Sequence, residues 1–212
     1  MITDQQLRKI MPQAGARLTP HLPYISEALE LGKINTPERI AAFIAQLAHE
    51  SGQYLYMEEI ADGSAYEWRE DLGNNQSGDG PKYKGHGPIQ ITGRLNHRLC
   101  GEFMGLDLIN NPTLITRPEY GTKSAAWFWL KAKPALNPCA DKGWFYVTTR
   151  LINGGDNGWD DRLKFYQRSR AELGLGAYTK EAEVRSIREF QSTHGLAVDG
   201  NAGPRTLAAL SA

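Results

Sequence analysis

Two glutamates, Glu50 and Glu59, stand nine residues apart and are the candidates for chemistry in this chain. A pair of carboxyl groups held at a fixed separation is the machinery that cleaves a glycosidic bond. Glu50 follows an apolar helical stretch and His49, and a carboxylic acid at a half-buried helix end suits the general-acid role. A more solvated partner would act as the general base that activates water. The pair therefore predicts a glycoside hydrolase.

The two carboxylates can flank one substrate only if the helix that carries Glu50 ends before Glu59. On one continuous helix, nine residues at about 100° each would place the two side chains on opposite faces. The sequence predicts a helix with Thr36 as N-cap, Pro37 in the first helical position and apolar residues at helical spacing. Gly52 is the predicted stop, so Glu59 is expected to return on a loop or strand.

Other catalytic chemistries lack the residues they require. A zincin needs HExxH, but Gln53 occupies the position four residues after His49. The chain has no G-x-S-x-G elbow for a serine nucleophile, and the glycine-rich stretch 73–87 lacks the phosphate-binding pattern GxxxxGK[ST]. We therefore expect neither a metal nor an organic cofactor. Glu58 remains a competing choice for the second carboxylate.

Composition excludes several classes of partner. The 212 residues include 24 Lys and Arg and 24 Asp and Glu, so no net charge attracts nucleic acid or anionic lipid. No apolar run approaches the roughly 18 residues that span a membrane, and the N-terminus has no signal-peptide pattern. We expect a monomer that is made in the cytoplasm and is not inserted into the membrane. Two reduced structural thiols, rather than a disulfide, are the favoured interpretation of Cys100 and Cys139.

The remaining elements follow from local patterns. We expect a loop or hairpin over 73–87, a short strand over 89–92, helices over 118–131 and 159–173, and a separate tail over 179–212. The two tryptophans of the first of these helices are expected in the core more than at a sugar.

Residues 1 to about 175 resemble the family-19 glycoside hydrolases, the chitinase family that also contains many phage endolysins. Four sequence blocks in family order carry this resemblance: Ala48-His49-Glu50-Ser51-Gly52, Tyr83-Lys84-Gly85-His86-Gly87-Pro88-Ile89-Gln90-Ile91-Thr92, Ile152-Asn153-Gly154-Gly155 and Asp161-Arg162-Leu163-Lys164-Phe165-Tyr166. The resemblance implies a mainly α-helical, lysozyme-like fold of two lobes with a cleft between them, a small β part and a short helical appendage.

The resemblance also implies residue roles. Glu50 matches the general acid, Glu59 rather than Glu58 matches the general base, and Thr92 takes the place of a residue that holds the attacking water. The family mechanism is inverting, which requires about 6.5–9.5 Å between the carboxyl groups. The other implied positions are Gln90, Asn96 and Asn153 for substrate contact, and Arg162 for an ionic network with the carboxylates. A surface salt bridge on a helix is the alternative for Arg162.

The tail contains Phe190-Gln191, Gly195-Leu196-Ala197-Val198-Asp199-Gly200 and Gly203-Pro204-Arg205-Thr206. Through these residues it resembles a peptidoglycan-binding module of about half the usual length. We therefore predict a catalytic domain over 1–175 and a half module over 179–212, which either binds glycan or packs on the catalytic domain. The expected function is hydrolysis of peptidoglycan at the β-1,4 bond between N-acetylmuramic acid and N-acetylglucosamine. The expected setting is a phage endolysin released by a holin-type helper. A chitinase, a non-catalytic glycan-binding protein and a toxin against competing bacteria are the alternatives.

Overall fold

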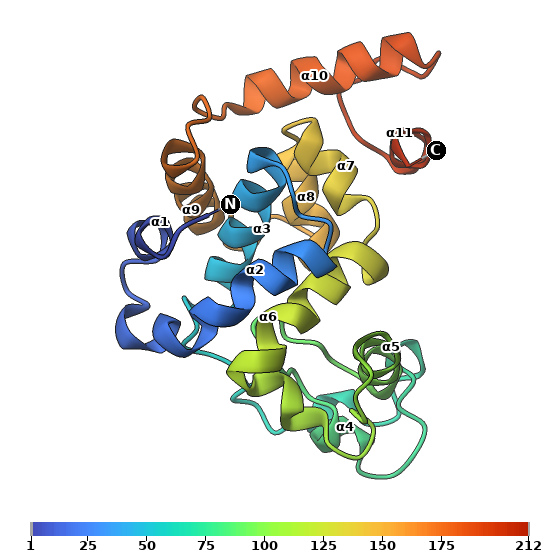
Figure 1. The fold of residues 1–212 in the computed structure, drawn as a ribbon. Helices are drawn as coiled ribbons and strands as arrows, with labels where there is room; N and C mark the ends of the chain where they lie inside the picture. Colours follow the sequence, from blue (N-terminus) through green and yellow to red (C-terminus); the bar gives the residue numbers. More distant parts are fainter. Residues whose placement is uncertain (1, 212) are drawn as a thin grey trace. The chain divides into compact units, whose positions relative to one another are not determined.

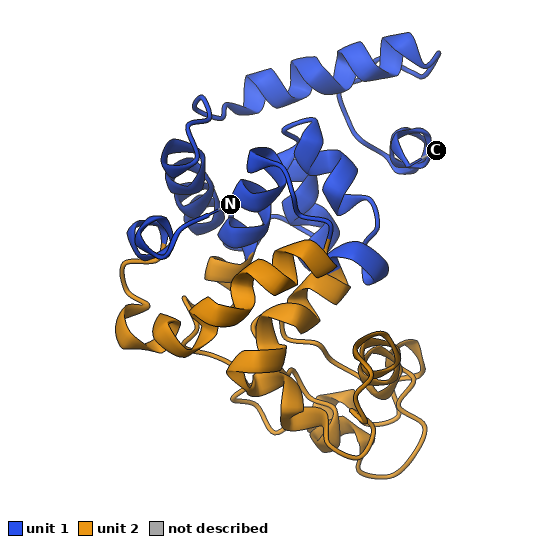
Figure 2. Ribbon diagram, in the orientation of Figure 1, with its two compact units in different colours: residues 1–10, 33–46, 129–212 blue, residues 11–32, 47–128 orange. Residues whose placement is uncertain are grey.

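The computed structural model describes residues 2–211, which consist almost entirely of helices and the turns that join them (Figure 1). The predicted mainly α-helical class is confirmed. The chain divides into two compact units, which Figure 2 colours separately. Unit 1 comprises Met1–Ile10, Lys33–Gln46 and Trp129–Ala212, and unit 2 comprises Met11–Gly32 and Leu47–Phe128. The predicted domain boundaries at 175 and 179 stay a prediction.

The elements of unit 1 are helices of two to four turns. They are α1 (Asp4–Ile10), the start of α3 (Pro37–Glu50), α7 (Leu136–Asp141), α8 (Phe145–Asn153), α9 (Trp159–Glu172), α10 (Lys180–Thr193) and α11 (Pro204–Leu210). Helix α1 lies against α9, and α8 lies against both α7 and α10. The helix predicted over 159–173 is thus confirmed as α9.

Unit 2 contains shorter elements and longer turns. Its helices are η1 (Gly15–His21), α2 (Leu22–Leu31), η2 (Ser64–Tyr66), η3 (Glu70–Leu72), α4 (Asp79–Lys82), α5 (Arg94–Met104), η4 (Pro112–Thr116) and α6 (Pro118–Trp127). A π-helical segment, Phe128–Ala132, continues α6, so the helix predicted over 118–131 is confirmed. Both of its tryptophans are buried, as expected. Among residues 2–211, none of the helices is both long and apolar enough to cross a bilayer.

Helix α3 begins and ends where the sequence predicts. The Thr36 hydroxyl oxygen accepts a hydrogen bond from the Arg39 amide at 3.2 Å, which is the N-cap contact, and Pro37 is the first helical residue. The helix ends at Glu50. Its end therefore presents the first candidate carboxylate at the beginning of a turn.

The turn after α3 has a strained backbone. Three consecutive residues, Gly52, Gln53 and Tyr54, have φ angles of 53°, 58° and 62°, in the left-handed region. Each non-glycine residue there costs about 1–2 kcal/mol. The Ser51 hydroxyl accepts a hydrogen bond from the Tyr54 amide at 2.8 Å and donates one to the Leu47 carbonyl at 2.7 Å, which holds the turn. The predicted stop at Gly52 is confirmed, and two further residues share its conformation.

The strand predicted over 89–92 is wrong. Residues 87–90 form a tight turn in which the Gln90 amide donates to the Gly87 carbonyl at 3.1 Å, and Gln90 has a φ of 54°. His86 and Ile91 flank this turn and pair through two backbone hydrogen bonds of 3.0 and 2.8 Å. Gly87, at a φ of 76°, reverses the chain before a strand can extend. Within the described residues, the expected β part is limited to two isolated bridges. The loop predicted over 73–87 contains the single helical turn α4.

The C-terminal tail shares a hydrophobic core with α7 and α8. Trp144, Val147, Ile187 and Phe190 are buried together with Cys139. Both cysteines are free thiols, in line with the favoured reading, and burial raises the pKa of Cys139 to about 12. The tail therefore packs against residues of the predicted catalytic domain, which was one of the two expectations for it.

A buried carboxylate on α10 caps the neighbouring helix α8. Glu183, only 3% exposed, accepts hydrogen bonds from the Tyr146 amide at 2.9 Å and the Val147 amide at 3.0 Å. The Tyr178 hydroxyl donates to the same carboxylate at 2.7 Å. Because the first amides of a helix have no partner within it, this side chain supplies acceptors that α8 lacks.

Substituting Glu183 by glutamine is expected to weaken this packing. Glutamine offers one acceptor oxygen where glutamate offers two, so one α8 amide is left without a partner. We expect the free energy of unfolding to fall by about 1–3 kcal/mol, measured by urea denaturation. The matched control is Glu189→Gln, an exposed carboxylate on the same helix, which should change stability by less than about 0.5 kcal/mol. Equal effects in the two variants would contradict the capping role.

Candidate active site

Glu59 is held by two uncharged donors in unit 2. Its Oε1 accepts a hydrogen bond from the Tyr66 hydroxyl at 2.8 Å, and its Oε2 accepts one from the Gly85 amide at 2.8 Å. The Glu59 amide donates in turn to the Gly85 carbonyl at 2.8 Å. The hydrogen bond with the carboxylate raises the pKa of Tyr66, so this hydroxyl remains a donor at neutral pH. The half-buried carboxylate is thus fixed in orientation without a neutralising cation.

Gly85 lies close to two candidate site side chains. A Cβ at this position would lie 2.5 Å from Oε1 of Gln90 and 3.2 Å from Oε2 of Glu59. A side chain at residue 85 would therefore displace the end of the Gln90 side chain and press on the carboxylate of Glu59.

Glu58, the competing choice for the second carboxylate, has a different environment. Its Oε1 forms a salt bridge with Nζ of Lys84 at 2.9 Å, and its side chain is 48% exposed. The hydrogen bond from Lys84 lowers the pKa of Glu58. A carboxylate paired with an ammonium group is a weakened base, which disfavours Glu58 as the second carboxylate.

Glu50 lies at the last residue of α3, beside His49. The residue is half-buried, and its Oε1 has almost no accessible surface. It belongs to unit 2 together with Glu59, Gln90, Thr92 and Asn96. A partly desolvated carboxyl group at a helix end is the environment expected of a general acid.

A series of hydrogen bonds from side chains to backbone carbonyls links Gln90, Thr92 and Asn96. The Asn96 side-chain amide donates to the Thr92 carbonyl at 2.8 Å, and the Thr92 hydroxyl donates to the Gln90 carbonyl at 3.0 Å. The Gln90 side-chain amide donates to the Gly87 carbonyl at 3.0 Å. Because the Thr92 proton is used in this way, its oxygen is left to accept a hydrogen bond from a water molecule.

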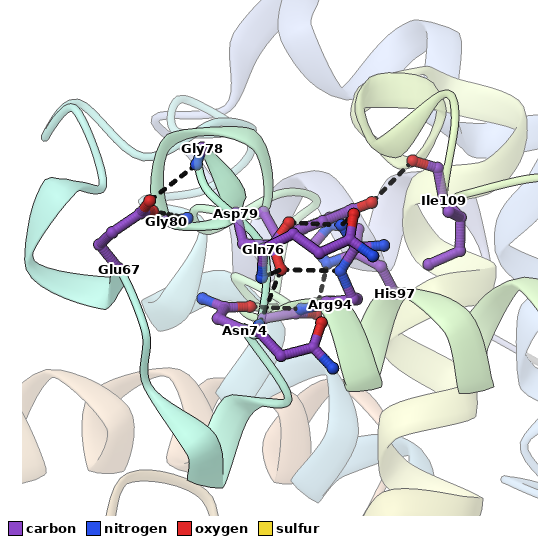
Figure 3. Close-up of polar contacts among 12 residues, drawn as sticks. Glu67, Asn74, Gln76, Gly78, Asp79, Gly80, Arg94, His97 and Ile109 are labelled. Atoms are coloured by element: carbon purple, nitrogen blue, oxygen red, sulfur yellow. Dashed lines mark hydrogen bonds and ion pairs between the residues drawn. The ribbon is translucent and has the colours of Figure 1, made fainter.

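A buried ion pair organises the loop of residues 74–79 (Figure 3). Asp79, 1% exposed, binds the Arg94 guanidinium and accepts hydrogen bonds from the amides of Asn75 and Gln76 at 2.9 and 3.0 Å. The Arg94 backbone amide donates to the side chain of Asn74 at 2.8 Å. This network ties the loop of residues 74–79 to the start of α5.

The network reaches the candidate base through Asn74 and Tyr66. The Asn74 side-chain amide donates to the Tyr66 carbonyl at 2.7 Å, and the Tyr66 hydroxyl contacts Glu59. Glu67 strengthens the same loop by accepting hydrogen bonds from the amides of Gly78 and Gly80, both at 2.7 Å (Figure 3). No sequence motif indicates these residues; the one signal is an aspartate between two glycines at residues 78–80.

Two histidines of unit 2 are structural. His86 and His97 are buried, and Nδ1 of His86 lies 3.0 Å from Nε2 of His97. Nδ1 of His97 lies 2.9 Å from the Gly93 carbonyl, which can only accept, so this nitrogen carries the proton. Burial lowers the pKa of His97 to about 4, so its ring is neutral at pH 7. Residues 2–211 contain no cluster of three metal-ligating side chains.

Asn153 and Arg162 lie together in unit 1. Both donate to the Asn157 carbonyl, at 2.9 Å from the Asn153 amide and 3.1 Å from Nε of Arg162. Nη1 of Arg162 binds Oε1 of Gln46, whose amide donates to the Thr149 hydroxyl at 2.8 Å. Arg162 is only 2% exposed, which excludes the surface salt bridge considered for it. The two residues thus shape the loop between α8 and α9.

Replacing Tyr66 by phenylalanine removes one of the two donors to Glu59. We expect kcat to fall about ten- to a hundredfold, because a hydrogen bond to a charged group contributes about 1.5–3 kcal/mol. KM should change by less than about twofold, since the hydroxyl contacts the carboxylate and binding of the ground state is unaffected. Steady-state kinetics on a soluble N-acetylglucosamine oligomer measures both. Tyr120→Phe, on α6, is the matched control, and an equal loss there would contradict the assignment.

The fold and the carboxylate site define a class of glycoside hydrolase. A bacterial family 19 chitinase of known structure superposes with a TM-score of 0.70 at 25% identity, covering 84% of this chain and 98% of that one. A family model described as chitinase class I matches residues 28–180, and a model of a peptidoglycan-binding domain matches residues 162–210. The chain belongs to the family-19 glycoside hydrolases, and the predicted lysozyme-like fold is confirmed.

Two further relatives are similar in sequence. An endochitinase from Arabidopsis thaliana is 42% identical over 125 residues, which cover 55% of this chain and 39% of that protein. Inactive chitinase-like protein 1 from Hevea brasiliensis is 32% identical over 176 residues, which cover 65% and 55%. The chain spans about half the length of the curated relatives it matches.

Proposed function

We propose that this protein hydrolyses the β-1,4 glycosidic bonds of bacterial peptidoglycan by an inverting mechanism. Glu50 is the general acid and Glu59 is the general base. The observation that carries the proposal is the setting of Glu59, whose two oxygens are held by the Tyr66 hydroxyl and the Gly85 amide. Neither donor carries a charge, and the two hydrogen bonds fix the orientation of the carboxylate.

The reaction is a single displacement. Glu50 gives its proton to the leaving glycosidic oxygen while Glu59 takes a proton from the attacking water. Water adds to the anomeric carbon from the opposite face, so the configuration inverts. Thr92 is assigned to accept a hydrogen bond from that water. Substrate contact is assigned to Gln90, Asn96 and Asn153, and Arg162 is assigned to fixing the loop beside Asn153.

Peptidoglycan is proposed as the polymer because residues 162–210 match a peptidoglycan-binding domain. Peptidoglycan and chitin share the β-1,4-linked N-acetylglucosamine unit and differ by the lactyl-peptide branch. The corresponding setting is a phage endolysin whose access to the wall depends on a holin-type helper. A chitinase is the second candidate, because the Arabidopsis thaliana relative is named an endochitinase.

Product analysis tests the proposal. Purified peptidoglycan and chitin tetramers are incubated separately with the full chain, and new reducing ends are identified by mass spectrometry. The expected result is the appearance of new N-acetylmuramic acid reducing ends. Proton NMR should show that these ends are first released as the α-anomer. If only chitin is cleaved, giving new N-acetylglucosamine ends, the proposed peptidoglycan hydrolase is wrong and the chitinase takes its place. No cleavage of either polymer would overturn both and favour a glycan-binding protein, a possibility that the inactive Hevea brasiliensis relative keeps open.

A further inference from the structure

Unit 1 contains a pocket that the catalytic proposal does not use. Its volume is about 520 Å³, which lies within the range of small-molecule binding sites. The end of α8 forms one wall, and the start of α10 and residues 200–207 form the other. The α8 wall lies outside residues 162–210, so the pocket is not a feature of the peptidoglycan-binding segment alone.

The polar groups of the pocket favour an anion. Arg150 and Lys180 line it, and both residues are exposed. Nζ of Lys180 lies 3.7 Å from the centroid of the Tyr146 ring, and this cation–π contact holds the ammonium group at the wall. Glu183 is the one carboxylate among the described lining residues, and its two oxygens already accept three hydrogen bonds from Tyr146, Val147 and Tyr178.

Apolar side chains form another part of the lining. Leu151, Val184, Ile187 and Leu207 face the same space. A ligand that satisfies both parts of the pocket must combine carboxylates with short alkyl groups. Neutral sugar chains such as chitin have no carboxylate, whereas the stem peptide of peptidoglycan carries several beside its alanine and diaminopimelate side chains.

The pocket also adjoins a loop assigned to substrate contact. Gly154 lines it, and the neighbouring Asn153 side chain accepts a hydrogen bond from the Gly155 amide at 2.8 Å. A sugar that contacts Asn153 would therefore carry its peptide branch close to the pocket.

We propose that this pocket binds the acidic stem peptide of peptidoglycan, with Arg150 and Lys180 receiving its carboxylates and the apolar wall receiving its alkyl groups. The inference rests on the proposed function, because it takes peptidoglycan as the polymer. In this proposal, the group of the bacterial cell wall that is recognised is the peptide branch, which chitin lacks. The pocket that recognises it is formed jointly by α8 and the tail.

The test uses a probe without sugar, the N-acetylated tripeptide acetyl-L-Ala-γ-D-Glu-meso-diaminopimelate, titrated into the full chain by calorimetry. Wild type should bind it, with an affinity that falls as salt is raised. Arg150→Glu and Lys180→Glu should each weaken binding at least tenfold, or about 1.4 kcal/mol. Arg185→Glu, an exposed arginine of α10 outside this pocket, is the matched control and should bind as wild type does.

Further variants and a parallel activity measurement distinguish a wrong pocket assignment from a misfolded variant and from a wrong proposed function. Arg150→Gln and Lys180→Gln remove the charges more conservatively, and thermal unfolding shows that each variant is folded. Wild type that binds no tripeptide, or equal binding in all variants, overturns the pocket assignment. Cleavage of peptidoglycan by wild type is measured in parallel. Tripeptide binding without cleavage supports the pocket and refutes the hydrolase proposal, whereas cleavage without tripeptide binding does the reverse.

Discussion

Replacing Glu59 by glutamine is expected to lower kcat about a thousandfold, since general acid–base catalysis contributes about 10²–10⁴-fold. The amide keeps the shape of the side chain and one acceptor oxygen but cannot take a proton from water. Glu50→Gln should cause a loss of the same order, because the leaving oxygen then receives no proton. Initial rates on soluble peptidoglycan fragments, with reducing ends quantified, measure both variants.

Glu58→Gln is the matched control for this prediction. It changes an adjacent carboxylate that is exposed and already paired with Lys84. We expect its kcat to stay within about twofold of wild type, because exposed ion pairs contribute little energy. A large loss in Glu58→Gln with normal rates in Glu59→Gln would reverse the assignment of the base.

A second readout distinguishes a base from a residue that only maintains structure. In Glu59→Ala, added azide should restore turnover, because this anion attacks the anomeric carbon without losing a proton. The product expected from an inverting reaction is the glycosyl azide of inverted configuration. Glu50→Ala should not be restored in this way on a substrate with a sugar leaving group. Recovery of neither variant, with normal substrate binding, would contradict the assignment of Glu59.

The part of the site that sequence predicts is the part governed by local rules. Thr36 and Pro37 start α3 through a cap and a fixed φ, and Gly52 ends it by adopting a positive φ. These are contacts within one helical turn, and the residue types alone indicate them. The position of Glu50 at the helix end follows directly from these local contacts.

The contacts that fix Glu59 cannot be read in the same way. Its carboxylate meets the Tyr66 hydroxyl and the Gly85 amide, which are 7 and 26 residues further along the chain. Hydrogen bonds from irregular turns have no periodicity, so no pattern in the sequence indicates them. The strand prediction over 89–92 is wrong for a related reason. Gln90 adopts a φ of 54°, and its residue type does not predict this conformation.

Replacing Asp79 by alanine is expected to lower the free energy of unfolding by about 3 kcal/mol, toward the lower end of the loss seen when one partner of a buried ion pair is removed. Arg94 would lose its carboxylate, and two backbone amides would lose their acceptor. Urea denaturation measures the loss. Glu102→Ala is the matched control, because its pair with Arg98 is exposed, and it should cost less than about 0.5 kcal/mol. Equal losses in the two variants would contradict a stabilising role for the buried pair.

The pH dependence of this stability gives an independent check. The hydrogen bond from Arg94 is the largest cause that lowers the pKa of Asp79 below its ordinary value. Asp79 therefore stabilises the fold fully above its unfolded pKa of about 3.9, and this contribution is lost as the pH falls through the lower folded pKa. The stability difference between wild type and Asp79→Ala should shrink below about pH 4.

Because Asn74 links the same network to Tyr66, Asp79→Ala should also lower kcat under conditions where it remains folded. A variant that is destabilised but fully active would separate the ion pair from the positioning of Glu59.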